Sequence, residues 1–210
     1  MRYAFAFGLP FLLGLAFAPR AANAEASRYR IDREASRGLI HVGKAGLLSF
    51  AGHEHEVVAP DVRDSVTADA ERPEQASVEV TFDASALRVT GAGEPAKDVA
   101  DVQRTMLGPE CLDAARFPTI RFVSSSVVPA GDEAGARRLA IHGALTLHGV
   151  TRPITVHARV DFEGDKVAAS GTLTVRQTDF GIKPISKAGV VNVKDELNVT
   201  WRLVGRRDEH

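Results

Sequence analysis

Hydrophobic and polar residues alternate along much of the second half of the chain. The alternation is clearest over residues 139–147, 154–162, 167–175 and 197–203. A period of two places neighbouring side chains on opposite faces of a β-strand, so these segments predict four half-buried strands. The bend at residues 149–153 further predicts that the first two strands form an antiparallel hairpin.

The first half of the chain is less regular but similar in kind. In one segment, residues 95–107, Val99, Val102 and Met106 recur at helical spacing before Gly108-Pro109 stops the pattern, which predicts a short amphipathic helix. Five runs rich in Val, Ile, Phe and Thr predict further strands, at residues 39–42, 56–58, 66–68, 78–82 and 120–123. About eight or nine antiparallel strands without βαβ alternation predict an all-β fold. Periodicity does not decide between a closed barrel and a sandwich.

The N-terminal segment has the features of a secretory signal. Arg2 precedes an apolar stretch over residues 4–18, and Ala22-Asn23-Ala24 offers the small-x-small pattern that a signal peptidase requires. We therefore expect residues 1–24 to be a signal peptide and residues 25–210 to form one exported domain, because no repeat or long polar linker divides them. The expected compartment is the periplasm.

Charge and cysteine content narrow the function classes. The 210 residues carry a formal net charge of -1, which provides no long-range attraction for polyanions, so nucleic acid is not an expected partner. Cys111 is the only cysteine, and an internal disulfide is therefore excluded. No phosphate-binding loop or nucleophile motif is present in the sequence, and no catalytic residue is assigned.

The segment His53-Glu54-His55 is the sharpest local motif. In an extended strand His53 and His55 point to the same side and could offer two imidazoles to one zinc ion, with Glu54 as a general base. This gives one alternative function, a zinc-dependent periplasmic enzyme. The competing interpretation is a polar strand edge without metal, and no metal ligand is assigned. His148, at the mouth of the predicted hairpin, is interpreted either as a partner of a backbone carbonyl or as a group that recognises a ligand head.

Four segments in register resemble the YceI-like family of lipid- and polyisoprenoid-binding proteins. The similarity covers nearly all of the expected mature chain, and its motifs are Tyr29-Arg30-Ile31-Asp32, Phe117-Pro118-Thr119-Ile120-Arg121-Phe122, residues 145–153 and residues 176–182. Gly52-His53-Glu54-His55 resembles a Gly-His-x-His-bearing branch of that family, and differs from its better-known members. The end of the cavity that would bind a head group is therefore expected to differ as well.

The resemblance implies a lipocalin-like antiparallel β-barrel of about eight strands with one or two short helices. It also implies a periplasmic protein that binds or carries an amphiphilic lipid, a polyisoprenoid or an isoprenoid quinone-like molecule, and that does not catalyse a reaction. A bound isoprenoid or fatty lipid would be the ligand, and no cofactor is expected. Transient membrane contact and a homodimer are left open, and a barrel filled by its own side chains would be only an interaction module.

Under this resemblance the helix covers the pocket and the strands supply its walls. The expected lipid-binding residues are Phe82, Val99, Val102, Met106, Leu107, Phe122, Leu145, Leu147, Ile154, Val156, Leu173, Val175 and Phe180. The polar residues expected to bind the head group are His53, His55 and His148. An error of one residue in register would turn any of the strand positions to the opposite face.

Overall fold

The structure is a computed structural model. It describes residues 26–45, 54–60, 62–63, 65–69, 71–133, 135–187 and 191–208. The expected signal peptide, residues 1–24, and the expected head-group residue His53 lie outside the described residues.

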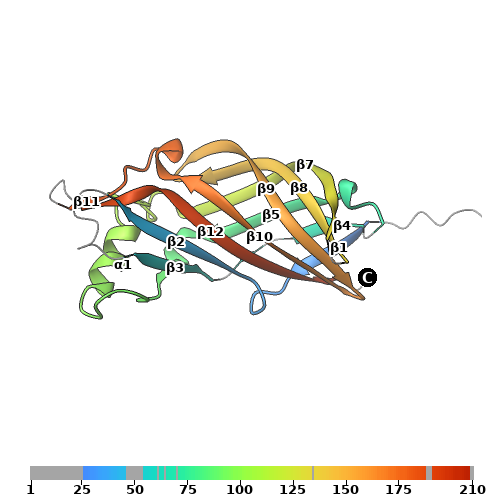
Figure 1. The fold of residues 1–210 in the computed structure, drawn as a ribbon, viewed down its shortest axis with the longest axis horizontal. Helices are drawn as coiled ribbons and strands as arrows, with labels where there is room; N and C mark the ends of the chain where they lie inside the picture. Colours follow the sequence, from blue (N-terminus) through green and yellow to red (C-terminus); the bar gives the residue numbers. More distant parts are fainter. Residues whose placement is uncertain are drawn as a thin grey trace, which may run out of the picture.

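Eight antiparallel strands close into a barrel (Figure 1). The ring closes because the first strand, β1, pairs on one side with β4 and on the other with the last strand, β12. In spatial order the ring consists of β1 (Ser27–Ile31), β4 (Ser65–Ala68), β5 (Ser77–Asp83), β7 (Thr119–Glu133), β8 (Ala136–Leu147), β9 (Val150–Glu163), β10 (Lys166–Arg176) and β12 (Val191–Arg207). The predicted all-β antiparallel barrel is thus confirmed.

The long strand β12 also carries a second group of strands near the end of the barrel opposite the C-terminus. There it pairs with β2 (Arg37–Ala45), which pairs in turn with β3 (His55–Ala59) and then with β6 (Arg88–Val89). The two-residue strand β11 (Ser186–Lys187) adds to β12 at the same end. The sequence analysis did not predict β1, β6 or β11, and β6 and β11, of two residues each, are too short to show an alternation.

The predicted hairpin is formed by β8 and β9, but its turn is tighter than the sequence suggested. Leu147 pairs with Val150, which leaves only His148 and Gly149 in the turn, and both have positive φ values, 52° and 73°. Positive φ at both central residues is the requirement of a type I′ hairpin. The strand therefore begins at Val150, and Pro153 lies inside it.

Pro153 is tolerated because β9 has only one strand partner at that position. β9 pairs with β8 from Val150 to Val160, whereas its register with β10 covers only Arg159–Glu163 against Lys166–Ser170. Proline lacks the backbone N–H that a second partner would require, and is found at such edges. Between residues 153–158 of β9 and residues 171–176 of β10 the barrel wall therefore has a seam without strand pairing.

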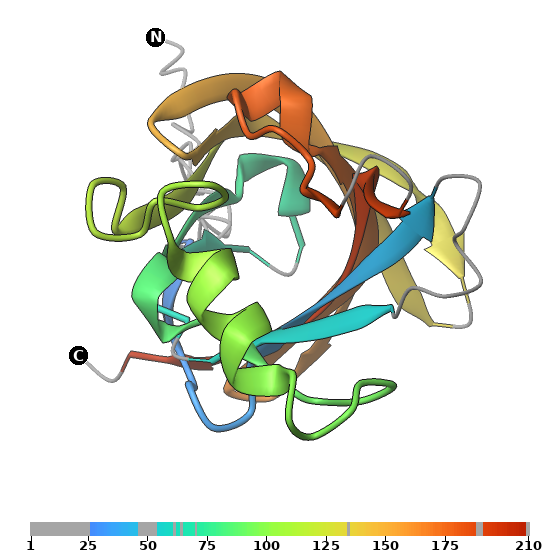
Figure 2. The same ribbon diagram turned by 90° about the vertical axis from the view of Figure 1, so that its left-hand side faces the viewer.

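One α-helix lies across the end of the barrel among the residues that the structure describes. Figure 2 shows helix α1 (Val99–Leu107) crossing in front of the ring of strands. It ends at the predicted residue, Leu107, since Gly108-Pro109 cannot continue a helix, and it begins at Val99, later than the predicted start at residue 95. The Gln103 side chain ties it to the sheet: it accepts a hydrogen bond from Val89 N at 2.8 Å and donates one to the Leu87 carbonyl at 2.9 Å.

The barrel is filled with side chains at one end only. At the end formed by β1 and β4, Tyr29, Val127, Leu139 and Val160 belong to a buried hydrophobic cluster. Tyr29 is 1% exposed and contacts the Phe162 ring edge to face. The other end, beneath α1, is lined by apolar side chains that leave a space between them.

Candidate functional site

An apolar cavity occupies the barrel interior between the filled end and α1. Its volume is about 610 Å³, which lies within the range of roughly 300–1,000 Å³ that is usual for ligand sites. The inward positions of the alternating strands form its wall, so the same pattern that makes the strands also makes the lining. The arrangement can hold an apolar ligand.

Most of the residues expected from the resemblance line this cavity. The strands contribute eight of them and the helix two: Phe82, Phe122, Leu145, Leu147, Ile154, Val156, Leu173, Val175, Val102 and Met106. They come from five different strands and from α1. The structure therefore brings together residues as distant in sequence as Phe82 and Val175. Their part in lipid binding is still a prediction.

Three of the expected residues are placed elsewhere. Phe180 is 2% exposed and packs in a separate hydrophobic cluster with Leu147 and Ile182. It lies in the 3-10 helix η4 (Gln177–Phe180), where strand alternation no longer predicts which side a residue faces. All four expected helix residues pack against the cluster around Val57 and Leu87, but Val99 and Leu107, unlike Val102 and Met106, are not part of the cavity lining.

Sequence reasoning did not name the part of the wall that β2, β3 and β12 supply. The residues concerned include Ile40, Val42, Val57, Leu197, Val199, Trp201 and Leu203. Alternation over residues 197–203 predicted a strand and placed its four apolar residues on one face. What it could not show is that this face points into the same space, because that depends on long-range pairing.

Polar residues of the described chain gather at the end of the cavity beneath α1. His55 begins β3, and its Nδ1 lies 2.7 Å from Oε1 of Glu94. A carboxylate only accepts hydrogen bonds, so the imidazole N–H donates. Glu94 precedes α1 in a loop in which Gly91 and Gly93 both have φ values of 78°. Residues with side chains rarely adopt this conformation, and here it lets the loop turn back towards β3.

Two buried polar atoms in the cavity wall have no hydrogen-bond partner among the described residues. One is Glu94 Oε2, on a side chain that is 0% exposed, and the other is Trp201 Nε1. On neighbouring strands, Leu197 pairs with Val42 and Val42 pairs with His55, so Leu197 and His55 lie at the same height in the barrel. Trp201 lies four residues further along β12, opposite Gly38. At about 3.3 Å per residue the two levels are roughly 13 Å apart. The cavity thus has one polar level near α1 and a second one deeper in the barrel.

The structure does not bring His148 to this cavity. Its Nδ1 lies 3.2 Å from the Phe180 carbonyl oxygen, and its ring contacts the Phe117 ring with centroids 4.5 Å apart. These contacts support the interpretation of His148 as a partner of a backbone carbonyl. Its proposed part in head-group binding has no contact with the cavity to support it.

Within the described ranges, no three His, Cys, Asp or Glu side chains gather closely enough to hold a metal ion. His55 is occupied by Glu94, and Glu54 is exposed. Because His53 lies outside those ranges, the complete His53-Glu54-His55 motif is not described.

The single thiol also faces the cavity. Cys111 is part of the lining, and its burial raises the pKa of the thiol above its usual value. The neutral thiol is therefore favoured, and nucleophilic chemistry, which needs the thiolate, is disfavoured. Cys111 is thus a small, partly buried residue of the cavity wall.

Comparisons with known proteins agree with this architecture. In sequence, the chain is 29% identical over 194 residues to a UPF0312 protein of Pseudomonas syringae pv. tomato, covering 89% of this chain and 91% of that protein. It is also 29% identical over 170 residues to a UPF0312 protein of Pseudomonas fluorescens, covering 77% and 79%.

Solved structures share the fold at lower sequence identity. BcnA of Burkholderia cenocepacia superposes with a TM-score of 0.66 at 21% identity, covering 83% of this chain and 98% of BcnA. A polyisoprenoid binding domain from Saccharophagus degradans, implicated in plant cell wall breakdown, superposes with a TM-score of 0.61 at 14% identity, covering 86% and 98%. These likenesses concern the fold.

No helix in the described part of the chain is long and apolar enough to cross a membrane. The model of the YceI-like domain matches residues 29–204, which include all eight strands of the ring except the ends of β1 and β12. The closed antiparallel barrel, its apolar interior and this match lead to one conclusion: the chain belongs to the YceI-like domain family.

Proposed function

We propose that the protein binds one long-chain amphiphilic lipid of the isoprenoid class and carries it through the periplasm, without catalysing a reaction. The tail lies along the barrel and the head lies beneath α1. The observation that carries this proposal is the cavity of about 610 Å³, whose wall is mainly aliphatic and aromatic with polar side chains near α1. Burying a methylene group stabilises by about 0.8 kcal/mol, so a long tail supplies ample binding free energy.

The length of the cavity favours a long chain over a compact ligand. Along β12 the lining runs from Val193 to Leu203, which at about 3.3 Å per residue is roughly 33 Å measured along the strand. This is comparable to the roughly 30 Å hydrocarbon core of a bilayer. An isoprenoid tail of several units fits such a space.

Two further observations support transport of an exported cargo. The N-terminal sequence, with Arg2, an apolar stretch and Ala22-Asn23-Ala24, has the pattern of a secretory signal. The domain from Saccharophagus degradans with the same fold is described as polyisoprenoid binding. A barrel that buries its cargo keeps an insoluble tail out of water between membranes.

The test is mass spectrometry of the organic extract from protein purified out of its native periplasm without detergent. We expect one isoprenoid species at close to one molecule per chain. An intact, folded protein without enriched lipid would contradict the proposal. Zinc measured in the same sample tests the alternative enzyme that uses His53, Glu54 and His55: stoichiometric zinc lost in His53→Ala would support it.

A pair of variants locates the lipid. Leu145→Asp places a carboxylate in the cavity wall and should abolish lipid retention, because an unpaired charge opposes an apolar tail. Val128→Asp is the matched control, since Val128 is 46% exposed, and its lipid content should be unchanged. Circular dichroism establishes that both variants fold. Equal lipid content in folded Leu145→Asp and wild-type protein would show that the tail binds elsewhere.

A further inference from the structure

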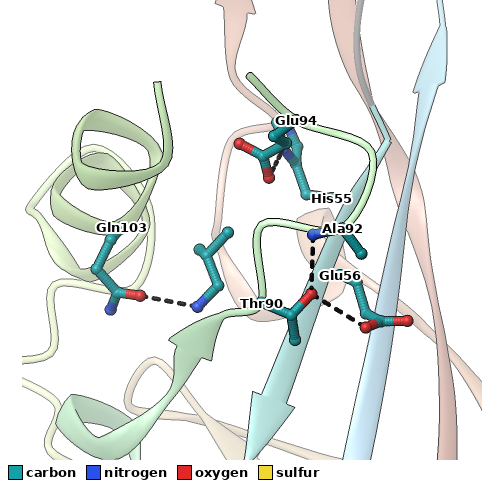
Figure 3. A network of polar contacts seen from close by, with 7 residues as sticks. His55, Glu56, Thr90, Ala92, Glu94 and Gln103 are labelled. Atoms are coloured by element: carbon teal, nitrogen blue, oxygen red, sulfur yellow. Dashed lines mark hydrogen bonds and ion pairs between the residues drawn. The ribbon is translucent and has the colours of Figure 1, made fainter. Parts of the chain in front are cut away.

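Glu94 Oε2, which has no hydrogen-bond partner among the residues that the structure describes, is the most unusual feature of the cavity. A buried carboxylate oxygen without a hydrogen bond destabilises a protein by several kcal/mol. Figure 3 shows one oxygen of Glu94 directed at His55, while the other points away from it. The His55 contact of 2.7 Å holds the side chain in place, so the free oxygen is fixed at the wall of the cavity.

The surrounding chain rigidly positions this group. Thr90 Oγ1 donates to a carboxylate oxygen of Glu56 at 3.0 Å and accepts from Ala92 N at 3.2 Å, which fixes the loop that carries Glu94 (Figure 3). Gln103, described above, fixes the helix that follows the loop. The free oxygen is therefore preorganised as a hydrogen-bond acceptor, and preorganisation reduces the entropic cost of binding a partner.

Charges at the same end of the cavity are unfavourable for an anion. Among the described lining residues, Glu94, Asp98 and Asp101 carry carboxylates, and Lys44 is the only lysine or arginine. Asp101 is paired with Arg104 at 2.6 Å, and Glu94 is paired with His55 through Oε1 only, so carboxylates outnumber lysines among these lining residues. A phosphate head would meet the buried carboxylate of Glu94, and repulsion between like charges is stronger away from water.

We propose that Glu94 Oε2 binds the head of the lipid and selects an uncharged head with an O–H donor, an isoprenoid alcohol, over a phosphate ester of the same chain. His55 acts as a positioning residue that orients the carboxylate. This inference rests on the proposed lipid-binding function and adds to it the chemical class of the head.

Three probes with one tail test the selection: geranylgeraniol, its methyl ether and geranylgeranyl monophosphate. Trp201 is the only tryptophan and lines the cavity, so its fluorescence reports binding to the delipidated protein. We expect the alcohol to bind about tenfold more tightly than the ether, which lacks the donor, and than the phosphate. In Glu94→Leu the alcohol and the ether should bind equally.

Two more variants separate recognition from structure. Glu94→Gln keeps an acceptor oxygen but loses the charge, so it should retain a preference for the alcohol over the ether and bind the phosphate more tightly than wild type does. Glu110→Leu removes an exposed carboxylate that is not part of the lining and should leave all three affinities unchanged.

The outcomes distinguish this inference from the function on which it rests. If wild-type protein binds the alcohol and the ether equally, or the phosphate as tightly as the alcohol, the assignment of Glu94 is overturned while lipid binding stands. The same holds if Glu94→Leu keeps the alcohol preference, since Glu94 would then be only structural. If the wild type binds none of the three probes, the proposed function fails and this inference fails with it.

Discussion

Single glycines determine how the largest side chains fit into the cavity wall. Gly171 faces Trp201 across β10 and β12, and a Cβ atom at residue 171 would lie 2.3 Å from the His157 carbonyl oxygen and 2.8 Å from the Trp201 ring. Gly143 leaves space for Phe122 in the same way, with its added Cβ 2.6 Å from that ring. The aromatic residues line the cavity because their neighbours have no side chain.

Gly171→Ala should therefore destabilise the protein and shift Trp201. Overpacking of this kind costs about 1–3 kcal/mol, measurable as a lower free energy of unfolding in urea, and the tryptophan emission of the folded variant should change. Gly38→Ala is the control, because its added Cβ would meet only Ala59 Cβ at 3.4 Å, an ordinary contact. Equal losses of stability in the two variants would contradict the proposed clash.

The sequence predicted which residues line the cavity where those residues lie inside a regularly alternating strand. Leu145, Leu147, Leu173 and Val175 were expected to line the cavity, and alternation does place them there. Glu94 was not expected, because it lies in a loop without periodicity and its meaning depends on His55, 39 residues earlier in the chain. A buried carboxylate in a loop leaves no local signal in the sequence.

At the scale of elements, α1 is a cover whose attachment depends on one side chain. Gln103 replaces the backbone partners that a further strand beside β6 would have provided, with hydrogen bonds to Val89 and Leu87. The side-chain contacts of α1 with the cluster around Val57 and Leu87 are apolar, and the Met106 and Leu107 carbonyls accept hydrogen bonds from Leu112 N and Ala114 N of the following loop. Apolar contacts without direction can slide, so Gln103 fixes where the helix lies.

Gln103→Leu should loosen this cover without emptying the cavity. Each lost hydrogen bond is worth about 1 kcal/mol, and the buried backbone N–H of Val89 would be left unpaired. We expect release of bound geranylgeraniol to accelerate about tenfold, measured by stopped-flow fluorescence of Trp201. Arg104→Leu, which removes an exposed ion pair from the same helix, is the control. Unchanged release in Gln103→Leu would mean that the lipid leaves by another route.

The elements themselves were predictable where they alternate regularly, whereas β7, which two register shifts interrupt, was predicted only at residues 120–123. β8, β9 and β10 alternate over ten or more residues and were recognised, as was the helix before Gly108-Pro109. The bend was placed at 149–153 because proline usually ends a strand. In fact Pro153 lies within β9, which lacks a second partner there. A proline at an edge and a proline in a turn have the same sequence signal.

At the scale of the whole molecule, carboxylates join distant parts of the barrel. Hydrogen bonds, mainly from backbone N–H groups and neighbouring side chains, lower the pKa of four of them: Asp32, Asp69, Asp83 and Asp195. Asp195 of β12 accepts from Thr178 N at 2.9 Å and from Arg176 Nε at 3.2 Å, which links η4 and β10 to the closing strand.

These lowered pKa values predict loss of stability in acid. A carboxyl group whose pKa is lower in the folded than in the unfolded chain stabilises the fold above the unfolded value, here about 3.8, and loses that effect as the pH falls through the folded value. We therefore expect thermal unfolding to occur at lower temperature at pH 3 than at pH 7. Asp195→Asn should destabilise at pH 7 and differ less from wild type at pH 3. If Asp195→Asn were less stable than wild type by the same amount at both pH values, the lowered pKa of Asp195 would not contribute to stability.

Closure of the barrel was the least accessible part of the fold. Periodicity allowed a sandwich as well as a barrel, and only the resemblance to the YceI-like family favoured the barrel. The deciding contact is between β1 and β12, with Tyr29 opposite Arg207, at the two ends of the domain. Such pairing over the whole chain length is a property of the folded molecule and has no local pattern.

The seam between β9 and β10 makes self-association a hazard for this protein. Residues 153–158 of β9 lack a strand on the side of β10, and an exposed strand edge is a template to which another copy can add, the first step towards aggregates. Pro153 removes one N–H from that edge, and Arg152, which donates to the Asp179 carbonyl at 2.9 Å, places a charged side chain and η4 beside it. A barrel wall with an unpaired stretch of strand thus also needs residues that keep a second chain from pairing with it.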